Sequence, residues 1–411
     1  MAPILVGFSA RNQWVETLSM ADKLRVLTLN SISHAGLKLL PADRYEVSNH
    51  AERPDAILVR SQDMHAMDIP DSVRTVGRAG AGTNNIPVDA LSRRGVPVFN
   101  APGANANAVK ELVLAGLLIA ARNLVPAVRF VDGLRGSGDE LEHLVEDNKK
   151  HYAGIELPRR TLGILGLGRI GSLVADAAIK LGMNVIGYDP EITVDAAWSL
   201  PSQVQRAHSI EEVLKGCEFV TLHVPLLPAT RHLINPERLA LMRHSAVLLN
   251  FARDGIVDAQ AVVEALAAKR LRGYVCDFPN PLFAGHPNVV ALPHLGASTR
   301  EAEDNCAVMV ANQVREYLEH GNIRNAVNFP DVVMERESPY RVCIANANVP
   351  NMLGQISTAV AAAGLNIHNM LNKSKREMAY TLVDVDSAVS RDVLQGLSAI
   401  KGVLAVRYLP A

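Results

Sequence analysis

The chain has 411 residues, of which 48% are hydrophobic and 20% are charged. This length exceeds what one hydrophobic core normally serves, so we expect two or three domains. Lysine and arginine total 41 against 42 for aspartate and glutamate. This balance removes the electrostatic reason to expect nucleic acid or an anionic membrane as the main partner, and it favours a small-molecule function.

The 4 cysteines are widely spaced and form no CxxC pair. They predict neither a metal site nor a disulfide framework, and they favour a reducing, cytoplasmic location. Residues 1–10 are apolar but lack a preceding basic region, so we interpret them as an extension and not as a signal peptide. Residues 112–121 are too short to cross a bilayer, and because they are apolar on every side we expect their helix to be buried between domains or subunits.

From Leu24 onward, short apolar runs alternate with helical ones as far as Asn100. Strands rich in valine, isoleucine and leucine without polar alternation are typical of a parallel sheet covered on both faces. This pattern predicts a small α/β domain, and we assign residues 1–103 to the first part of a substrate-binding domain.

A second α/β series begins at Leu162, within residues that we assign, as 104–296, to a Rossmann-like nucleotide-binding domain. The helical stretch that follows ends at Gly321, as a glycine at the C′ position would end it. We expect residues 297–328 to carry the chain back to the first domain. The nucleotide-binding domain is then inserted into the substrate-binding one.

The last part of the chain predicts a third, smaller domain. Residues 329–338 are charged, bracketed by prolines and without period, which indicates a linker. Residues 339–411 follow the order βαββαβ, which is the ferredoxin-like pattern. The predicted fold class is therefore two α/β domains with parallel Rossmann-like or flavodoxin-like sheets, followed by a ferredoxin-like domain.

The stretch "LGILGLGRIG" predicts a dinucleotide site. Gly166 permits a tight turn after a strand, Gly168 lets the backbone approach a pyrophosphate, and Gly171 allows close helix packing. The phosphates would lie on free N–H groups at the start of the helix. Asp189 ends the next strand, where a carboxylate can accept hydrogen bonds from a ribose diol, and Pro190 and Glu191 supply no cation for a 2′-phosphate. NAD is therefore favoured over NADP.

Four apolar strands of this domain end in polar groups, namely His223, Arg253, Asp277 and His294. Because ligands bind at the carboxyl ends of strands in an open parallel sheet, we expect a cluster beside the nicotinamide. An arginine can hold a carboxylate by two hydrogen bonds, and a histidine can remove a hydroxyl proton as hydride leaves. We assign these two roles to Arg253 and His294, although a lone histidine at a strand end is more often structural.

The motifs "GLGRIG", "HVPLLPATRHLIN", "NFARDGIVD" and "PHLGAST" resemble those of the D-isomer-specific 2-hydroxyacid dehydrogenases. The resemblance implies that Arg253 binds the substrate carboxylate, that His294 is the acid/base and that Asp277 serves the carboxamide side of NAD. It implies further cofactor contacts from Ala81, Arg169, Ile170, Val224, Ala252, Gly296 and Ala297. It also implies substrate contacts from Arg60 and Ser61 of "LVRS", from Gly82, and from Lys149 acting on a neighbouring subunit; for Lys149 a solvated charge pair is an equally good interpretation.

The chain departs from the family pattern after the strand that ends in Asp277. Family members carry a glutamate there that pairs with the catalytic histidine, whereas this chain has "CDFPNPLFAGH", with Asn280 and Pro281 in that neighbourhood. Without this anionic partner, the imidazole tautomer is less firmly held. We therefore expect activity with an altered pH profile. Asp254 replaces the glycine that commonly follows the arginine, which is a smaller departure.

Residues from about Tyr340 resemble an ACT domain, a module that binds amino acids between two copies. Asn348 and Asn366 match effector-binding positions, and Asn346 replaces a nearby histidine of that motif. The resemblance implies L-serine as a possible effector. A dimerisation module without a ligand is an equally good interpretation.

The resemblance implies, as the leading hypothesis, an NAD-dependent enzyme that oxidises 3-phosphoglycerate to 3-phosphohydroxypyruvate and is assembled as a homodimer or homotetramer. One alternative is reduction of another 2-hydroxyacid pair such as hydroxypyruvate or glyoxylate. A second is a non-catalytic NAD sensor, for which the missing glutamate is the argument.

Overall fold

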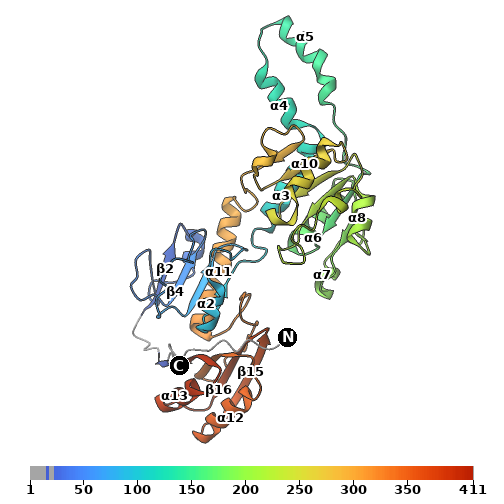
Figure 1. The fold of residues 1–411 in the computed structure, drawn as a ribbon. Coiled ribbons are helices and arrows are strands. Elements are labelled where there is room, and N and C mark those ends of the chain that lie inside the picture. The colour runs from blue at the N-terminus through green and yellow to red at the C-terminus, as the bar shows by residue number, and fades with distance from the viewer. Residues whose placement is uncertain (1–14, 18–22, 411) are drawn as a thin grey trace. The chain divides into compact units, whose positions relative to one another are not determined.

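The computed structural model describes residues 15–17 and 23–410. Residues 1–10, interpreted above as an extension, lie outside them. The chain divides into two compact units, of which unit 1 comprises residues 1–105 and 303–411 and unit 2 comprises residues 106–302. The chain thus begins one unit, leaves it for the other and returns, which confirms the predicted insertion (Figure 1).

The larger sheet of unit 2 is parallel throughout and carries the glycine-rich turn. Its strand order is β13-β12-β11-β10-β7-β8-β9, the order of a Rossmann sheet with one additional strand. The strands are β7 (Thr161–Leu165), β8 (Asn184–Tyr188), β9 (Gln205–Arg206), β10 (Phe219–Leu222), β11 (Val247–Asn250), β12 (Gly273–Cys276) and β13 (Val289–Ala291). The central strands β10 and β11 are buried along their whole length, as strands covered by helices on both faces must be.

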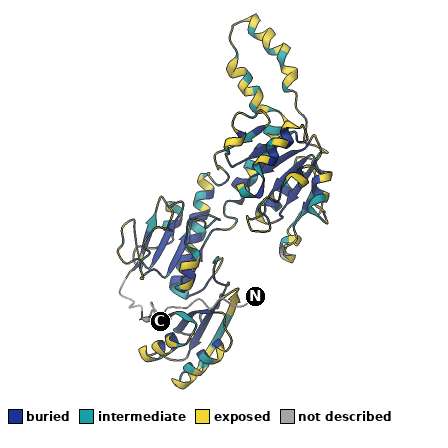
Figure 2. Cartoon of the chain, viewed as in Figure 1, coloured by how far each residue is buried: buried dark blue, intermediate teal, exposed yellow. Residues whose placement is uncertain are grey.

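Helices α3, α4 and α5 of unit 2 precede its first strand, β7, and the later helices lie between its strands. The helices are α3 (Ala106–Ala121), α4 (Leu124–Gly133), α5 (Asp139–Asn148), α6 (Arg169–Lys180), α7 (Val194–Trp198), α8 (Ile210–Gly216), α9 (Pro236–Leu239) and α10 (Ala259–Ala267), with 3₁₀ turns η1 (Lys149–Tyr152), η2 (Asp254–Ile256) and η3 (Pro281–Phe283). Helices α4 and α5 bury no side chain and project as an arm from the rest of unit 2 (Figures 1 and 2).

The apolar helix α3 is buried on one face, not on all sides. Val113 and Leu117 are fully buried, whereas Leu118 is 43% exposed in the single chain. The buried face packs against α6, β11 and β12. Among the described residues, no single helix has the length and apolar character needed to cross a membrane, while the bent pair α3 and α4 meets those two criteria jointly.

Unit 1 contains a parallel sheet with the strand order β3-β2-β4-β5-β6, which is the flavodoxin-like order. Its strands are β2 (Leu24–Leu29), β3 (Tyr45–Ser48), β4 (Ala56–Val59), β5 (Thr75–Arg78) and β6 (Val98–Phe99). Its helices are α1 (His34–Leu37), α2 (Val88–Arg93) and the return helix α11 (Arg300–His320). Helix α11 ends before Gly321, whose φ of 73° is the left-handed conformation expected at a C′ glycine.

The rest of unit 1 is the predicted βαββαβ module, with one unexpected strand added. Its sheet has the order β1-β17-β14-β16-β15, with β1 (Val15–Thr17), β14 (Tyr340–Ala347), β15 (Ile367–Lys375), β16 (Met378–Val385) and β17 (Val403–Leu409). Helices α12 (Met352–Ala362) and α13 (Arg391–Ala399) complete it. The added strand β1 pairs in parallel with the edge strand β17.

The segment expected to be a linker is packed into the core instead of lying in solvent. Phe329 and Val332 are fully buried, and Val332 forms an antiparallel bridge with Ile323. The sequence did not indicate this packing, because the charged residues and prolines of the segment are typical of a linker. Its two buried apolar side chains also follow no helical or strand period.

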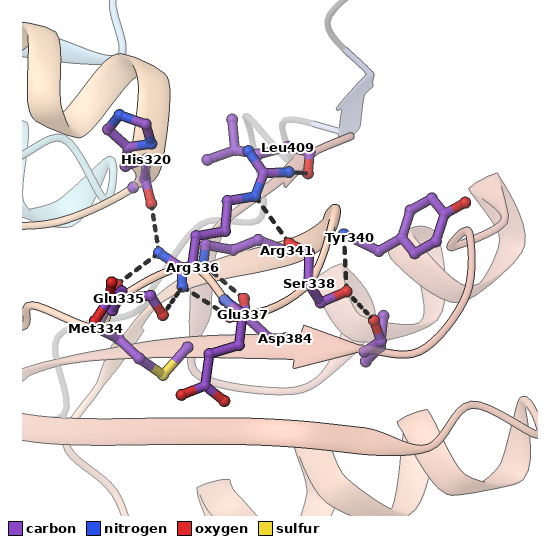
Figure 3. Close-up of polar contacts among 12 residues, drawn as sticks. His320, Met334, Glu335, Arg336, Glu337, Ser338, Tyr340, Arg341, Asp384 and Leu409 are labelled. Atoms are coloured by element: carbon purple, nitrogen blue, oxygen red, sulfur yellow. Dashed lines mark hydrogen bonds and ion pairs between the residues drawn. The ribbon is translucent and has the colours of Figure 1, made fainter. Parts of the chain in front are cut away.

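A buried arginine fastens this segment to the small sheet (Figure 3). Arg341 donates to both carboxylate oxygens of Asp384, at 2.6 and 2.8 Å, and neither side chain is exposed. Its remaining N–H groups donate to the carbonyls of His320, Met334 and Glu335 at 2.9–3.0 Å. The guanidinium thereby joins the end of α11, the segment and strand β16.

Replacing one member of this pair is expected to destabilise the chain strongly, because the remaining charge stays buried without its partner. We predict that Asp384→Ala lowers the free energy of unfolding by about 3–5 kcal/mol, measured by urea denaturation. Arg25→Ala is the control, because its contact with Glu46 is long, 3.7 Å, and exposed, and we expect a loss below about 1 kcal/mol. Equal losses in the two variants would contradict this role of Asp384.

Candidate active site

The register of the large sheet aligns the carboxyl ends of its strands. Across the sheet, Leu165 pairs with Leu222, Leu222 with Asn250, Asn250 with Cys276, and Cys276 with Ala291. The residues just beyond these positions therefore emerge at one edge of the sheet. This edge is where ligands bind in open parallel sheets.

The glycine turn after β7 has the geometry expected of a pyrophosphate cradle. Gly166 has a φ of 94°, and a Cβ on it would lie 2.6 Å from the carbonyl oxygen of His223. A Cβ on Gly171 would lie 2.0 Å from the carbonyl oxygen of Gly166, so the helix packs too closely for a side chain. A Cβ on Gly168, in contrast, would meet nothing within 4 Å. Backbone is therefore accessible there, beside the amides of Arg169 and Ile170 at the start of α6.

Asp189 lies directly after β8 and braces the same turn. Its Oδ2 accepts a hydrogen bond from the backbone N–H of Leu167 at 2.8 Å, and its Oδ1 accepts one from Glu191 at 3.0 Å. A carboxylate has about four acceptor positions, so Asp189 retains positions for the hydroxyls of a ribose.

His223 follows β10, next to the glycine turn. Its Nε2 lies 3.0 Å from Oγ1 of Thr221, and its buried Nδ1 has no hydrogen-bond partner among the described residues. Burial lowers the pKa of His223 to about 3. The imidazole is therefore neutral at physiological pH.

Arg253 is held in place by a residue that the sequence analysis missed. Asn250, fully buried at the end of β11, accepts a hydrogen bond from the N–H of Ala252 at 3.1 Å and donates to the carbonyl of Arg253 at 2.9 Å. The Arg253 guanidinium itself is half-buried and donates to the neighbouring carbonyl of Ala252 at 2.6 Å. The signal available in the sequence was a polar residue closing an otherwise apolar strand, which must be hydrogen-bonded if buried.

His294 lies in a turn that Asp277 stabilises. His294 has a φ of 59°, a left-handed conformation that is uncommon for residues other than glycine. The two oxygens of the buried Asp277 accept hydrogen bonds from the N–H groups of Leu295 and Gly296, each at 2.7 Å. The Phe278 ring packs edge-on against the imidazole with ring centroids 5.3 Å apart. Asp277 thus fixes the backbone that presents an exposed His294.

Within the part of the chain that the structure describes, no carboxylate pairs with the His294 imidazole. Asn280, in the region of the expected glutamate, instead caps the turn η3 and accepts a hydrogen bond from Leu282 at 3.0 Å. Asp254 is exposed at the start of η2. Strand β12 separates β11 from β13, so the loops bearing Arg253 and His294 start about 10 Å apart. The remaining expected cofactor residues follow the same strand ends: Val224, Ala252, Gly296 and Ala297.

The predicted substrate residues Arg60, Ser61 and Gly82 lie in unit 1, as does Ala81. They follow β4 and β5 at the carboxyl edge of the smaller parallel sheet. Asn30, which the sequence analysis missed, accepts hydrogen bonds from the N–H groups of Ser61 and Gln62 at 3.2 and 2.7 Å. The predicted site residues therefore come from both units.

Two groups of predicted residues are not brought to these edges. Lys149 lies in η1 and pairs with Glu146, and both side chains are more than half exposed. Asn346 and Asn348 are at the end of β14, whereas Asn366 precedes β15 at the opposite end of the sheet. The length of β14 separates these asparagines by roughly 25 Å within one chain. An effector held by both ends requires a second copy.

Comparison with known proteins decides the family. The model of the D-isomer specific 2-hydroxyacid dehydrogenase NAD-binding domain matches residues 114–296. A D-3-phosphoglycerate dehydrogenase of Haemophilus influenzae is 34% identical, over 81% of this chain and 80% of that protein. The chain belongs to the D-isomer specific 2-hydroxyacid dehydrogenase family.

A second relative and a solved structure are also similar to this chain. A D-3-phosphoglycerate dehydrogenase of Methanocaldococcus jannaschii is 36% identical over 84% of this chain, and the match spans 63% of that relative's length. The crystal structure of a Thermus thermophilus protein, 31% identical, superimposes on 74% of this chain and 100% of that one with a TM-score of 0.61. The cofactor predicted from the glycine turn, NAD, is confirmed by the family of the domain that carries it.

Asp277 provides a test of how the His294 turn is held. We predict that Asp277→Asn lowers kcat by about tenfold to a hundredfold, because an amide accepts only one of the two backbone hydrogen bonds and displaces the imidazole. Asp258→Asn is the control, since Asp258 caps α10 without bonding to the His294 turn and asparagine caps equally well. Steady-state NADH formation measures both variants. An unchanged kcat for Asp277→Asn would refute this positioning role.

Proposed function

We propose that the chain is an NAD-dependent D-3-phosphoglycerate dehydrogenase, which oxidises 3-phosphoglycerate to 3-phosphohydroxypyruvate. The observation that carries this proposal is the placement of Arg253 and His294 after β11 and β13, at the carboxyl edge that bears the glycine turn. The relatives of that name, at 34% and 36% identity, support the choice of substrate.

The residues present fit NAD. The open space beside Gly168 and the left-handed Gly166 form a cradle that any larger side chain would fill. The start of α6 would hold the pyrophosphate, Asp189 the ribose and Asp277 the carboxamide side. Bound NAD⁺ supplies the acceptor for the hydride on C2 of the substrate.

The protein's own groups position the alcohol and take its proton. The Arg253 guanidinium holds the substrate carboxylate by paired hydrogen bonds, which fixes C2. His294 accepts the C2 hydroxyl proton as that oxygen becomes a carbonyl oxygen, and it returns the proton in the reverse direction. Asn250 and Asp277 keep the two loops in place through the hydrogen bonds described above. Arg60, Ser61 and Gly82 would receive the phosphate.

His294 provides the test of this function. We predict NADH formation at alkaline pH with 3-phosphoglycerate, and a loss of at least about a hundredfold in kcat for His294→Ala, since acid–base catalysis contributes 10²–10⁴-fold. His244→Ala is the control, because exposed His244 lies before β11 at the opposite edge of the sheet. Turnover that is equal in the wild type and His294→Ala would refute the assignment, and a faster reaction with unphosphorylated 2-hydroxy acids would favour another reductase.

For residues 339–411 we propose an ACT domain that binds L-serine between two copies of the chain in a dimer or tetramer. The positions of Asn348 and Asn366 at opposite ends of the sheet support a shared site. We predict that L-serine slows the reaction and raises the melting temperature, and that Asn366→Ala removes both effects. D-serine is the control. Identical rates and melting temperatures with the two enantiomers would contradict specific binding of L-serine by this domain.

A further inference from the structure

The guanidinium of Arg60 forms an ion pair with a carboxylate of the same chain. Its Nη2 lies 2.7 Å from Oε1 of Glu303, and the two side chains are 32% and 40% exposed. Arg60 follows β4, and Glu303 lies in the first turn of α11. The group assigned above to the substrate phosphate is therefore engaged by a carboxylate when no substrate is bound.

Other charged residues neighbour the pair of Arg60 and Glu303. Arg78 donates through Nε to the carbonyl of Arg60 at 3.1 Å. Asp304, which accepts a hydrogen bond from Ser33, acts on Glu303 from the next position of α11. The pair of Arg60 and Glu303 therefore lies next to a second arginine and a second carboxylate.

Glu303 is ionised where the enzyme works. The hydrogen bond from Arg60 is the main cause that lowers the pKa of the Glu303 carboxyl below its usual value. At neutral and alkaline pH it therefore presents a full negative charge to any group that approaches Arg60.

We propose that Glu303 is a specificity-determining residue, which forms an ion pair with Arg60 in place of the substrate phosphate. The proposal rests on the function proposed above. A phosphate group carries a charge of about −1.5 to −2 at pH 7, so it must displace Glu303 from Arg60 and then remain beside it. Like charges in contact at a binding surface oppose association. A 2-hydroxy acid without phosphate meets no such competition. Glu303 therefore reduces the preference of the enzyme for phosphorylated over unphosphorylated 2-hydroxy acids.

The test compares Glu303→Gln with Glu301→Gln. Glu301 is exposed in the same turn of α11 and, among the described residues, forms no ion pair, so it controls for the change of charge. The measured quantity is kcat/KM for 3-phosphoglycerate divided by kcat/KM for D-glycerate. We expect Glu303→Gln to raise this ratio about tenfold or more through a lower KM for the phosphorylated substrate, and Glu301→Gln to change it less than about twofold.

Three outcomes of this comparison would overturn the proposal. An unchanged ratio would show that Glu303 does not compete with phosphate. A lower ratio would show that Glu303 instead orients Arg60 for phosphate binding. An equally large rise in Glu301→Gln would show that the ratio depends only on net charge, and this would also contradict the proposal.

Binding of inorganic phosphate, followed by isothermal titration calorimetry with NAD⁺ present, separates this inference from the proposed function. Tighter binding by Glu303→Gln than by the wild type supports the competition even if 3-phosphoglycerate is not oxidised, whereas absence of oxidation counts only against the function. In the Arg60→Gln background the Glu303 effect should vanish. If the Glu303 effect persists in the Arg60→Gln background, or if no variant binds phosphate, then Arg60 is not the group for which Glu303 and phosphate compete.

Discussion

The parallel direction of neighbouring strands is the constraint on which the candidate site depends. In the sheet of unit 2, paired positions such as Asn250 and Cys276 are level with each other, so every carboxyl end opens at one edge. A glycine turn, a guanidinium and an imidazole from distant parts of the sequence are gathered by this register alone. In the smaller parallel sheet, Val59 of β4 is level with Arg78 of β5, so the residues that follow these two strands open at one edge in the same way.

At these edges, polar side chains bind backbone and so fix the loops to which the proposed function assigns the chemistry. Asp277 holds the turn of His294, Asn250 holds the backbone around Arg253, and Asn30 holds the start of the Ser61 loop. Each of these three polar residues lies at or just beyond the end of a strand. A loop tied at that point keeps its functional side chain in one position, which catalysis by orientation requires.

Helix α11 connects the two sheets of unit 1. Its first turn supplies Glu303 to Arg60. Near its end, Arg407 donates to the carbonyls of Tyr317 and Leu318, at 3.2 and 3.0 Å, and Arg341 donates to that of His320. These cations bind carbonyls of the last turn of the helix, at the end where its dipole favours positive charge. The ferredoxin-like sheet is thereby fastened to the helix that contacts the predicted phosphate-binding residue.

The sequence by itself determined the order of elements, the insertion of one α/β domain into another, the glycine turn and the polar residues at strand ends, because each is a local pattern of period, turn chemistry or composition. Only the tertiary structure decided that Asp277 braces Leu295 and Gly296, that Glu303 occupies Arg60, and that residues 329–338 are packed. Such pairings depend on sheet register and helix packing between residues far apart in the chain, and no local pattern encodes them.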